Sequence, residues 1–130
     1  MKKDQPIALV TNKSQSPYPL INKINIKLGS EIMLIDVDTI LMVEKSINKT
    51  IIHCKNQKYC TNESLKSIED KLKPYSFLRC HKSFIINPNH VTKVIPLGNR
   101  TYEVLLNKDG VSAFASRLKV ATLFSVLGIE

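Results

Sequence analysis

The chain has 130 residues, enough for one domain with a modest core, and its 19 basic and 11 acidic residues give a formal net charge of +8. Three cysteines, an odd number, argue against a secreted disulfide scaffold and for a reducing cytoplasm. No apolar run approaches the roughly 20 residues of a membrane span, and the N-terminus lacks a signal-peptide core. The charge excess reflects either solubility alone or attraction to a polyanion.

The first 22 residues are rich in Lys, Asn, Ser, Gln and Pro, with room for only a short strand at residues 7–10. Such a composition is typical of a mobile arm or a loosely docked tail. We therefore predict an N-terminal arm over residues 1–22 and a single folded domain over residues 23–130.

The first half of the domain shows strand patterns before one clear helix. Apolar and polar residues alternate over 24–28, and Gly29-Ser30 predicts a hairpin turn into a strand at 31–35. A helical turn capped by Asp36 should follow, and then strands at 40–44, 50–54 and 59–60. A helix is expected over 61–72, capped by Thr61 or Asn62, with Leu65, Ile68 and Leu72 on its buried face. Pro74 prevents its continuation.

The second half repeats short strands and closes on another helix. Strands are expected near 91–95, 102–106 and 111–114, separated by turns at 97–100 and 107–110. Ser116 can cap a last helix over 117–127 that buries Leu118, Ala121 and Leu127. The pattern predicts a mostly β fold with short helices, and no basic amphipathic helix follows a tight turn as in a helix-turn-helix protein.

A row of five polar or ionisable residues, 79–83, stands between apolar residues on both sides. Asn87-Pro88 then breaks the run, because proline removes a donor and restricts the residue before it. The row lies in a window, 71–102, with six Lys or Arg and no acid, and 45–62 is a second acid-free window with four lysines. Four of the acids gather instead in 31–44, so the signs are separated, which suggests one basic face that attracts a polyanion.

The same row carries a resemblance to a known family. The pattern Phe-x-Arg-x-His-Lys-Ser-Phe-Ile-Ile-Asn over residues 77–87 resembles the signature of the LytTR family of bacterial DNA-binding domains. The similarity extends from about Ile24 to the C-terminus. It implies an elongated stack of small antiparallel sheets with a few helices, which reads the major grooves of double-stranded DNA through loops.

The resemblance also implies three base-reading loops. They are the loop after the strand at 40–44, the signature itself, and the Ser-Arg start of the last helix. Many relatives carry a second arginine where this chain has Leu118, so Arg117 or Lys119 would substitute for it. The candidate DNA contacts are Lys82, Ser83, Arg79, His81, Asn48, Lys49, Thr50, Arg117 and Lys119.

The side chains of the signature suit this role in different ways. Lys82 can reach a phosphate or a guanine edge, and the Ser83 hydroxyl can donate to a phosphate oxygen. Arg79 can pair with a phosphate bidentately, or with Asp36 or Asp38 to hold the fold. In an extended segment Arg79, His81 and Ser83 would share one side, opposite Cys80 and Lys82, and His81 would orient its neighbours.

Metal binding and catalysis find little support. His53-Cys54, Cys60 and Cys80-His81 lack the paired short spacing of zinc ligands, and no glycine-rich phosphate loop or catalytic motif is present. We expect no metal, no cofactor and no enzyme activity. Cys80 is either a thiol activated by Arg79 and His81 or, as we prefer, a small semi-buried residue.

We therefore predict a cytoplasmic bacterial transcription regulator that binds double-stranded DNA, with two copies on repeated half-sites and no membrane association. Relatives often carry an N-terminal receiver domain, which the residues before Ile24 are too few to form, so the chain is either a stand-alone regulator or is controlled from elsewhere. The alternative is a protein-interaction module of the same fold that sequesters another regulator. A single-stranded nucleic-acid binder would need more exposed aromatic residues than four Tyr and four Phe provide.

Overall fold

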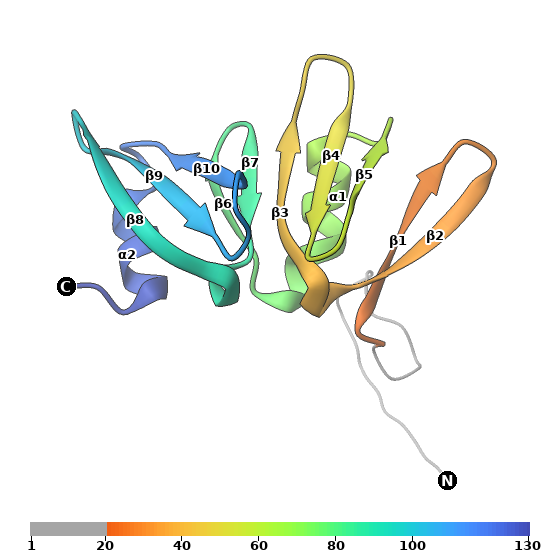
Figure 1. Ribbon diagram of the computed structural model, residues 1–130, viewed down its shortest axis with the longest axis horizontal. Helices are drawn as coiled ribbons and strands as arrows, with labels where there is room; N and C mark the ends of the chain where they lie inside the picture. The colour runs from red at the N-terminus through yellow and green to blue at the C-terminus, as the bar shows by residue number, and fades with distance from the viewer. Residues whose placement is uncertain (1–20) are drawn as a thin grey trace, which may run out of the picture.

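The computed structural model describes residues 21–130, so the expected strand at residues 7–10 and nearly all of the N-terminal arm lie outside the described residues. Three antiparallel sheets follow one another along the long axis of the molecule (Figure 1). Their strand orders are β1-β2, β5-β4-β3-β7-β6 and β10-β9-β8. The expected architecture, an elongated stack of small antiparallel sheets with short helices, is confirmed.

The first sheet is the expected hairpin. Strand β1 (Lys23–Leu28) pairs with β2 (Glu31–Asp36), and the turn between them contains Gly29 at a φ of +63°, a conformation that glycine adopts without strain. Ile24 and Ile26 are buried, whereas Asn25 and Lys27, which alternate with them, are exposed. The alternation in the sequence therefore predicted both the strand and its buried face.

The helical turn η1 (Val37–Thr39) follows β2, but Asp36 does not cap it with its side chain as expected. The Asp36 carboxylate instead accepts a hydrogen bond from Lys23 Nζ at 2.5 Å across the hairpin. Its main-chain carbonyl accepts one from the Thr39 hydroxyl at 2.7 Å. The position of the turn was predicted correctly, and the capping interaction was not.

The central sheet has a core on each face. It contains β3 (Ile40–Lys45), β4 (Thr50–Cys54), β5 (Lys58–Thr61), β6 (Leu78–His81) and β7 (Phe84–Ile86). Residues 40–43 of the middle strand β3 are all buried, because side chains of both faces have partners. One core lies toward β1, β2 and the first helix, and the other lies toward the third sheet and the second helix.

The first helix, α1 (Leu65–Leu72), begins later than expected. Ser64 is its cap, and the Ser64 hydroxyl accepts a hydrogen bond from Ser67 N at 3.0 Å. Thr61 does not cap this helix, because it is the last residue of β5 and its hydroxyl donates to the Lys27 carbonyl at 2.7 Å. The predicted buried face of Leu65, Ile68 and Leu72 is confirmed. The short helix η2 (Lys73–Tyr75) follows and includes Pro74.

The third sheet follows η3 (Pro88–His90) and contains β8 (Val91–Gly98), β9 (Thr101–Leu106) and β10 (Ser112–Ala115). All three expected strands are present. The expected loop at 97–100 is tighter than predicted, because β8 continues to Gly98 and only Asn99 and Arg100 form the turn, with φ angles of +52° and +59°.

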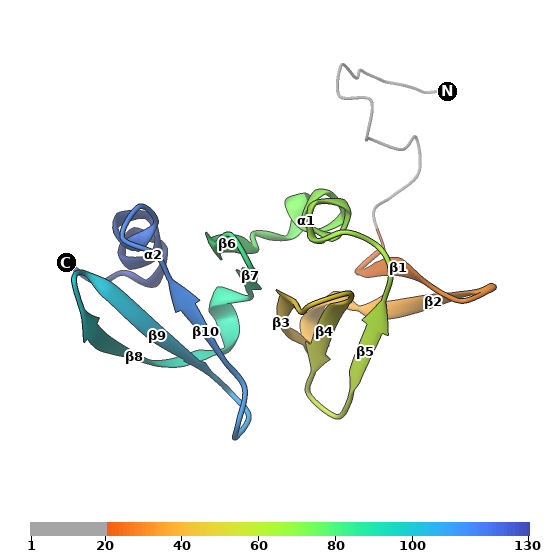
Figure 2. The same cartoon turned by 90° about the horizontal axis from the view of Figure 1, so that it is seen from above.

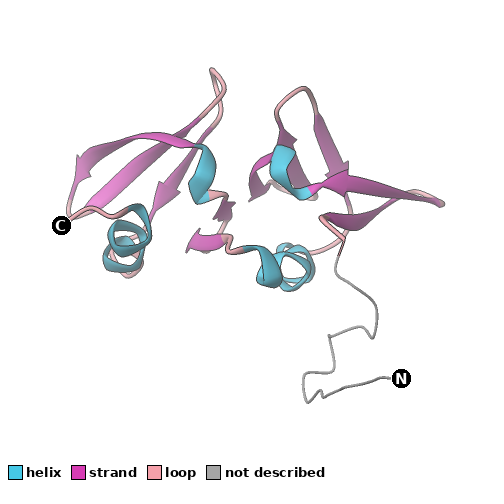
Figure 3. Ribbon diagram, turned by 90° about the horizontal axis from the view of Figure 1, so that it is seen from below, coloured by secondary structure: helices cyan, strands magenta, loops and turns pink. Residues whose placement is uncertain are grey.

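The second helix, α2 (Val120–Leu127), begins three residues after the predicted start, and Ser116 does not cap it. A turn closed by the Lys119 N–H and the Ser116 carbonyl, 2.9 Å apart, occupies these residues instead. Leu118, which we expected to be buried, is therefore 91% exposed, and Ala121 is exposed as well. Leu123 is the fully buried residue of the helix. Helices α1 and α2 lie on the same side of the molecule (Figures 2 and 3). No helix within residues 21–130 is long and apolar enough to cross a membrane.

Candidate nucleic-acid interface

The signature forms a tight β-hairpin, in which β6 and β7 pair and His81 lies opposite Phe84. Lys82 and Ser83 therefore form the two-residue turn between the strands. Lys82 is exposed and Ser83 is half-buried, and neither side chain has a hydrogen-bond partner among the residues that the structure describes. The ammonium group and the hydroxyl are thus both available to an external ligand.

Arg79 holds the main chain of this turn. Its guanidinium donates to the carbonyl oxygens of His81 at 3.0 Å and Lys82 at 2.5 Å. It also donates to Glu69 Oε1 on α1 at 2.7 Å. Asp36 and Asp38, the partners considered from the sequence, pair instead with Lys23 and the Asn22 amide. In this structure Arg79 is a positioning residue for Lys82, with most of its donors already used.

His81 also fixes the turn. The Ser83 main-chain N–H donates to His81 Nδ1 at 3.0 Å, so this nitrogen carries no proton. Burial, followed by the charges of Lys82 and Arg79, lowers the pKa of His81, which keeps the imidazole neutral and able to accept this bond. The ring packs on Phe84 with centroids 5.4 Å apart. The hydrogen bond from Ser83 is of the kind that the sequence led us to expect between His81 and its neighbours.

Cys80 and Lys82 do not share a side, contrary to the alternation expected. The pairing of β6 with β7 shifts register between Arg79 and His81, and the segment then turns at Lys82. Cys80 is fully buried in the second core, with Sγ 3.4 Å from the Phe114 carbonyl oxygen. Burial raises the pKa of the Cys80 thiol to about 12, so the activated thiol considered from the sequence is not present.

This burial predicts the reactivity of the cysteines. Cys60 is exposed, whereas Cys54 and Cys80 are buried. In the native protein an alkylating reagent at neutral pH should modify Cys60 and leave Cys80 unmodified until the chain unfolds, because the reactive species is the exposed thiolate. Mass spectrometry of timed samples with and without denaturant would measure this. Equal labelling of Cys60 and Cys80 in the native protein would contradict it.

The turn between β3 and β4 lies beside the signature. The Lys45 N–H at the end of β3 donates to the Ser83 carbonyl at 2.9 Å. The turn itself is closed by Ser46 N and the Lys49 carbonyl at 2.8 Å, which leaves residues 47 and 48 at its tip. Asn48 and Lys49 are exposed as expected, and Lys49 Nζ donates to Asn62 Oδ1 at 3.0 Å. Figure 1 shows this turn and the β6–β7 turn at the same edge.

Thr50 does not belong to the exposed set. It is only 2% exposed, and its hydroxyl donates to the Glu63 carbonyl at 2.6 Å. The reason is its place in β4, where it pairs with Lys45 on one side and Thr61 on the other. We therefore remove Thr50 from the candidate DNA contacts and keep its neighbours Asn48 and Lys49.

The third expected loop, which follows β10, contacts the β6–β7 hairpin at β6. The Ser116 N–H, directly after β10, donates to the Cys80 carbonyl of β6 at 3.0 Å. Arg117 and Lys119 in the following turn are exposed. Main-chain hydrogen bonds thus join residues at or next to these turns, Lys45 to Ser83 and Ser116 to Cys80, so that the turn residues 46–49, 82–83 and 116–119 follow in that order with the signature turn in the middle. We call these three segments the edge turns.

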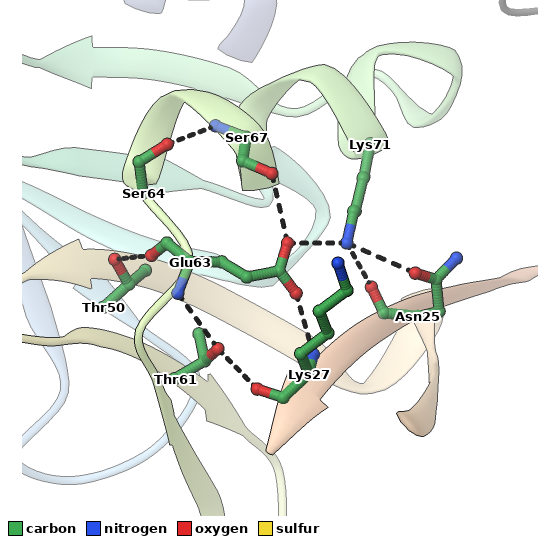
Figure 4. Close-up of polar contacts among 8 residues, drawn as sticks. All are labelled: Asn25, Lys27, Thr50, Thr61, Glu63, Ser64, Ser67 and Lys71. Carbon is green, nitrogen blue, oxygen red and sulfur yellow. Dashed lines mark hydrogen bonds and ion pairs between the residues drawn. The ribbon is translucent and has the colours of Figure 1, made fainter. Parts of the chain in front are cut away.

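Glu63 and Glu69, two acids that approach these segments in space rather than in sequence, are already paired. Glu69 binds Arg79, and Glu63 accepts from Lys71 Nζ at 2.7 Å, from Lys27 N at 2.8 Å and from Ser67 Oγ at 3.1 Å (Figure 4). Burial alone would raise the pKa of Glu63, but these hydrogen bonds outweigh it and lower the pKa. The exposed cations of the edge turns therefore face solvent without a neighbouring free carboxylate from Glu63 or Glu69.

Asn87, the last residue of the signature, is a structural residue that the sequence argument assigned no role. It is 4% exposed, and its amide donates to the Ile40 carbonyl at 3.0 Å while its Oδ1 accepts from Asn89 N at 3.1 Å. Both contacts join the end of β7 to the start of β3 and to η3. Its position between an apolar strand and a proline was the one available signal for such a cap.

No cluster that could hold a metal ion is found within residues 21–130. His53, one of the residues weighed as a zinc ligand, has Nε2 2.6 Å from Glu44 Oε1 on the neighbouring strand β3. Cys54 is buried beside it in the first core.

Comparison with known proteins agrees with the architecture and with the signature. The family model of the LytTr DNA-binding domain matches residues 30–128, most of the chain. The chain belongs to the LytTR family.

Two relatives that this chain matches are longer than the chain itself. The sensory transduction protein LytT of Bacillus cereus is 31% identical over 109 residues, which are 84% of this chain and 44% of that protein. The transcriptional regulatory protein LytR of Staphylococcus aureus strain MW2 is 30% identical over 116 residues, 89% of this chain and 46% of that protein. This chain thus spans less than half of their length.

A solved structure confirms the fold. The LytTr DNA-binding domain of a response regulator from Bacillus cereus superposes with a TM-score of 0.69. The match covers 84% of this chain and 99% of that one, at 23% sequence identity. The arrangement of sheets and helices is therefore that of a LytTR domain.

Proposed function

We propose that this chain binds double-stranded DNA sequence-specifically in the cytoplasm of a bacterium and regulates transcription, and that the edge turns read the DNA. The observation that supports this most is that two main-chain hydrogen bonds, Lys45 to Ser83 and Ser116 to Cys80, hold the strands that carry the three edge turns together. Each edge turn carries an exposed cation. Membership of the LytTR family and similarity to LytT and LytR agree with it. Because β7 also pairs with β3, the β6–β7 hairpin would present only its turn, Lys82 and Ser83, to the major groove.

The side chains of the edge turns are suited to different parts of the DNA. Lys82, at the tip of the central turn, is suited to the acceptor edge of guanine, and the Ser83 hydroxyl to a phosphate oxygen. Lys49, Arg117 and Lys119 are exposed cations on the flanking turns and would neutralise phosphates, which supplies affinity that does not depend on sequence. Arg79 and His81 act through the turn that they hold rather than by touching DNA. We propose two bound copies on repeated half-sites.

Selection of duplexes from a random pool would test this proposal. We expect enrichment of a pair of repeated boxes, and binding to them that weakens steeply with salt. Three phosphate contacts per copy correspond to a slope of log K against log salt of about −3 per bound copy. A pool without enriched boxes, or binding insensitive to salt, would contradict the proposal, and capture of another regulator by a chain that ignores DNA would favour the sequestering module instead.

A further inference from the structure

Two aliphatic side chains on the edge turns are almost fully exposed among the residues that the structure describes. Leu118 is 91% exposed and Ile47 is 89% exposed. The next most exposed large hydrophobic residue within residues 21–130 is Ile32, at 68%. Single exposed hydrophobic residues are common on protein surfaces and need no explanation alone. Here the two most exposed ones both lie at the edge that carries the cations.

Local turn structure does not require these residue types. Ile47 lies at the tip of the turn closed by Ser46 and Lys49, and Leu118 lies in the turn closed by Ser116 and Lys119. Both closures are main-chain hydrogen bonds, which any side chain at the tip would permit. Turn centres favour Gly, Asn, Asp, Ser or Pro, and neither Ile47 nor Leu118 is one of these types. A ligand contact would explain what local folding does not.

The two residues flank the central turn. The turn of Ile47 is joined to Ser83 through Lys45, and the turn of Leu118 is joined to Cys80 through Ser116. They therefore reach the β6–β7 hairpin from opposite sides. Each has a cation in its own turn, Lys49 or Arg117, so each aliphatic group faces a surface that attracts phosphates.

We infer that Ile47 and Leu118 read thymine, by contacting its 5-methyl group in the major groove on opposite sides of the base pair that Lys82 reads. This inference rests on the proposed function and names the bases of the flanking positions. The thymine methyl is the one apolar group that base edges present in the major groove, and aliphatic side chains are its usual partners. A protein partner fits less well, because the two residues are separated by the hairpin that carries Lys82 and each is next to a cation.

Replacement of thymine by deoxyuridine, which lacks only the methyl group, tests this directly. In the duplex enriched from a random pool, each thymine is replaced in turn and affinity is measured. We expect about fourfold weaker binding at one thymine on each side of the central position, as expected for leaving one methyl-sized apolar group in water. Replacement of any other thymine should leave the affinity unchanged.

Variants of the chain assign each methyl to its reader. Leu118→Ala should remove the sensitivity to deoxyuridine on one side only, and Ile47→Ala on the other side only. Ile32→Ala is the matched control, since Ile32 is an exposed aliphatic residue on β2 and should keep both sensitivities. All three residues are exposed, so the variants should fold normally.

The outcomes separate this inference from the proposed function. An enriched duplex that shows no effect of deoxyuridine, or that keeps both effects in Leu118→Ala and Ile47→Ala, overturns the inference and leaves sequence-specific binding intact. Failure to enrich any duplex overturns both.

Discussion

Replacing Lys82 with alanine should abolish most of the preference for the cognate duplex while leaving the fold and the non-specific affinity nearly unchanged. Lys82 is exposed at the tip of the β6–β7 turn, and its side chain contacts no residue within the described part of the chain that its loss would destabilise. A good contact with a guanine edge contributes about 1–3 kcal/mol of discrimination, so the ratio of specific to non-specific affinity should fall roughly 5- to 150-fold.

The comparison of two binding constants at several salt concentrations measures this. A base reader changes the ratio between cognate and random duplexes, whereas a phosphate contact weakens both equally and reduces the salt slope by about one. Lys108→Ala is a suitable control, because Lys108 is an exposed lysine in the β9–β10 turn rather than in an edge turn. An unchanged ratio in Lys82→Ala, with a smaller salt slope, would assign Lys82 to the phosphates.

The same measurement on the variant Arg79→Lys tests how the turn that carries Lys82 is held. Because the Arg79 guanidinium donates to the His81 and Lys82 carbonyls, Arg79→Lys should keep a positive charge near the turn but lose the fork that fixes its main chain. We expect it to lower the preference for the cognate duplex in the same direction as Lys82→Ala, without the cation being lost. A normal preference in Arg79→Lys would show that the turn holds its shape by other means.

The sequence predicted the elements that depend on local patterns. Alternation of apolar and polar residues predicted β1, and Gly29-Ser30 between the strands predicted the hairpin turn into β2. The apolar stripe of α1 was correct because Leu65, Ile68 and Leu72 lie within two turns of one helix. The signature located the central edge turn, since it is a contiguous segment whose ends are apolar strands.

Three of the errors involve contacts between residues far apart in the chain. The start of α1 was misplaced because the Thr61 hydroxyl is bound by Lys27, 34 residues earlier. The partner of Arg79 was missed because Glu69 becomes its neighbour only when α1 packs against the sheet. Leu118 was assigned to a helical face, but the hydrogen bond from Ser116 to Cys80 leads the chain through a turn first. No local pattern contains these pairings.

Glu63 should contribute more to stability than any other acidic residue that we describe. Its carboxylate accepts hydrogen bonds from Lys71, from the Lys27 main chain on β1 and from Ser67, and its own carbonyl accepts from Thr50 (Figure 4). It thereby connects α1 to the first sheet and lies with only 12% of its side chain exposed. Glu63→Gln keeps the shape but loses the charge that Lys71 faces. Hydrogen bonds to charged groups contribute about 1.5–3 kcal/mol, and we expect a loss of about 2–3 kcal/mol in the free energy of unfolding.

The pH dependence of unfolding distinguishes this ion pair from simple packing. The pKa of Glu63 is lowered in the folded protein, so the unfolded chain takes up a proton at a higher pH than the folded one. The stabilisation is therefore complete above the unfolded pKa, about 4.3, and is lost as pH falls below it toward the folded pKa. Urea unfolding of the wild type and Glu63→Gln should give curves that converge on acidification, whereas Glu31→Gln, at an exposed carboxylate in the β1–β2 hairpin, should follow the wild type throughout. A constant difference between wild type and Glu63→Gln across this range would mean that the carboxylate contributes by shape alone, and that α1 is held to the first sheet by its apolar face.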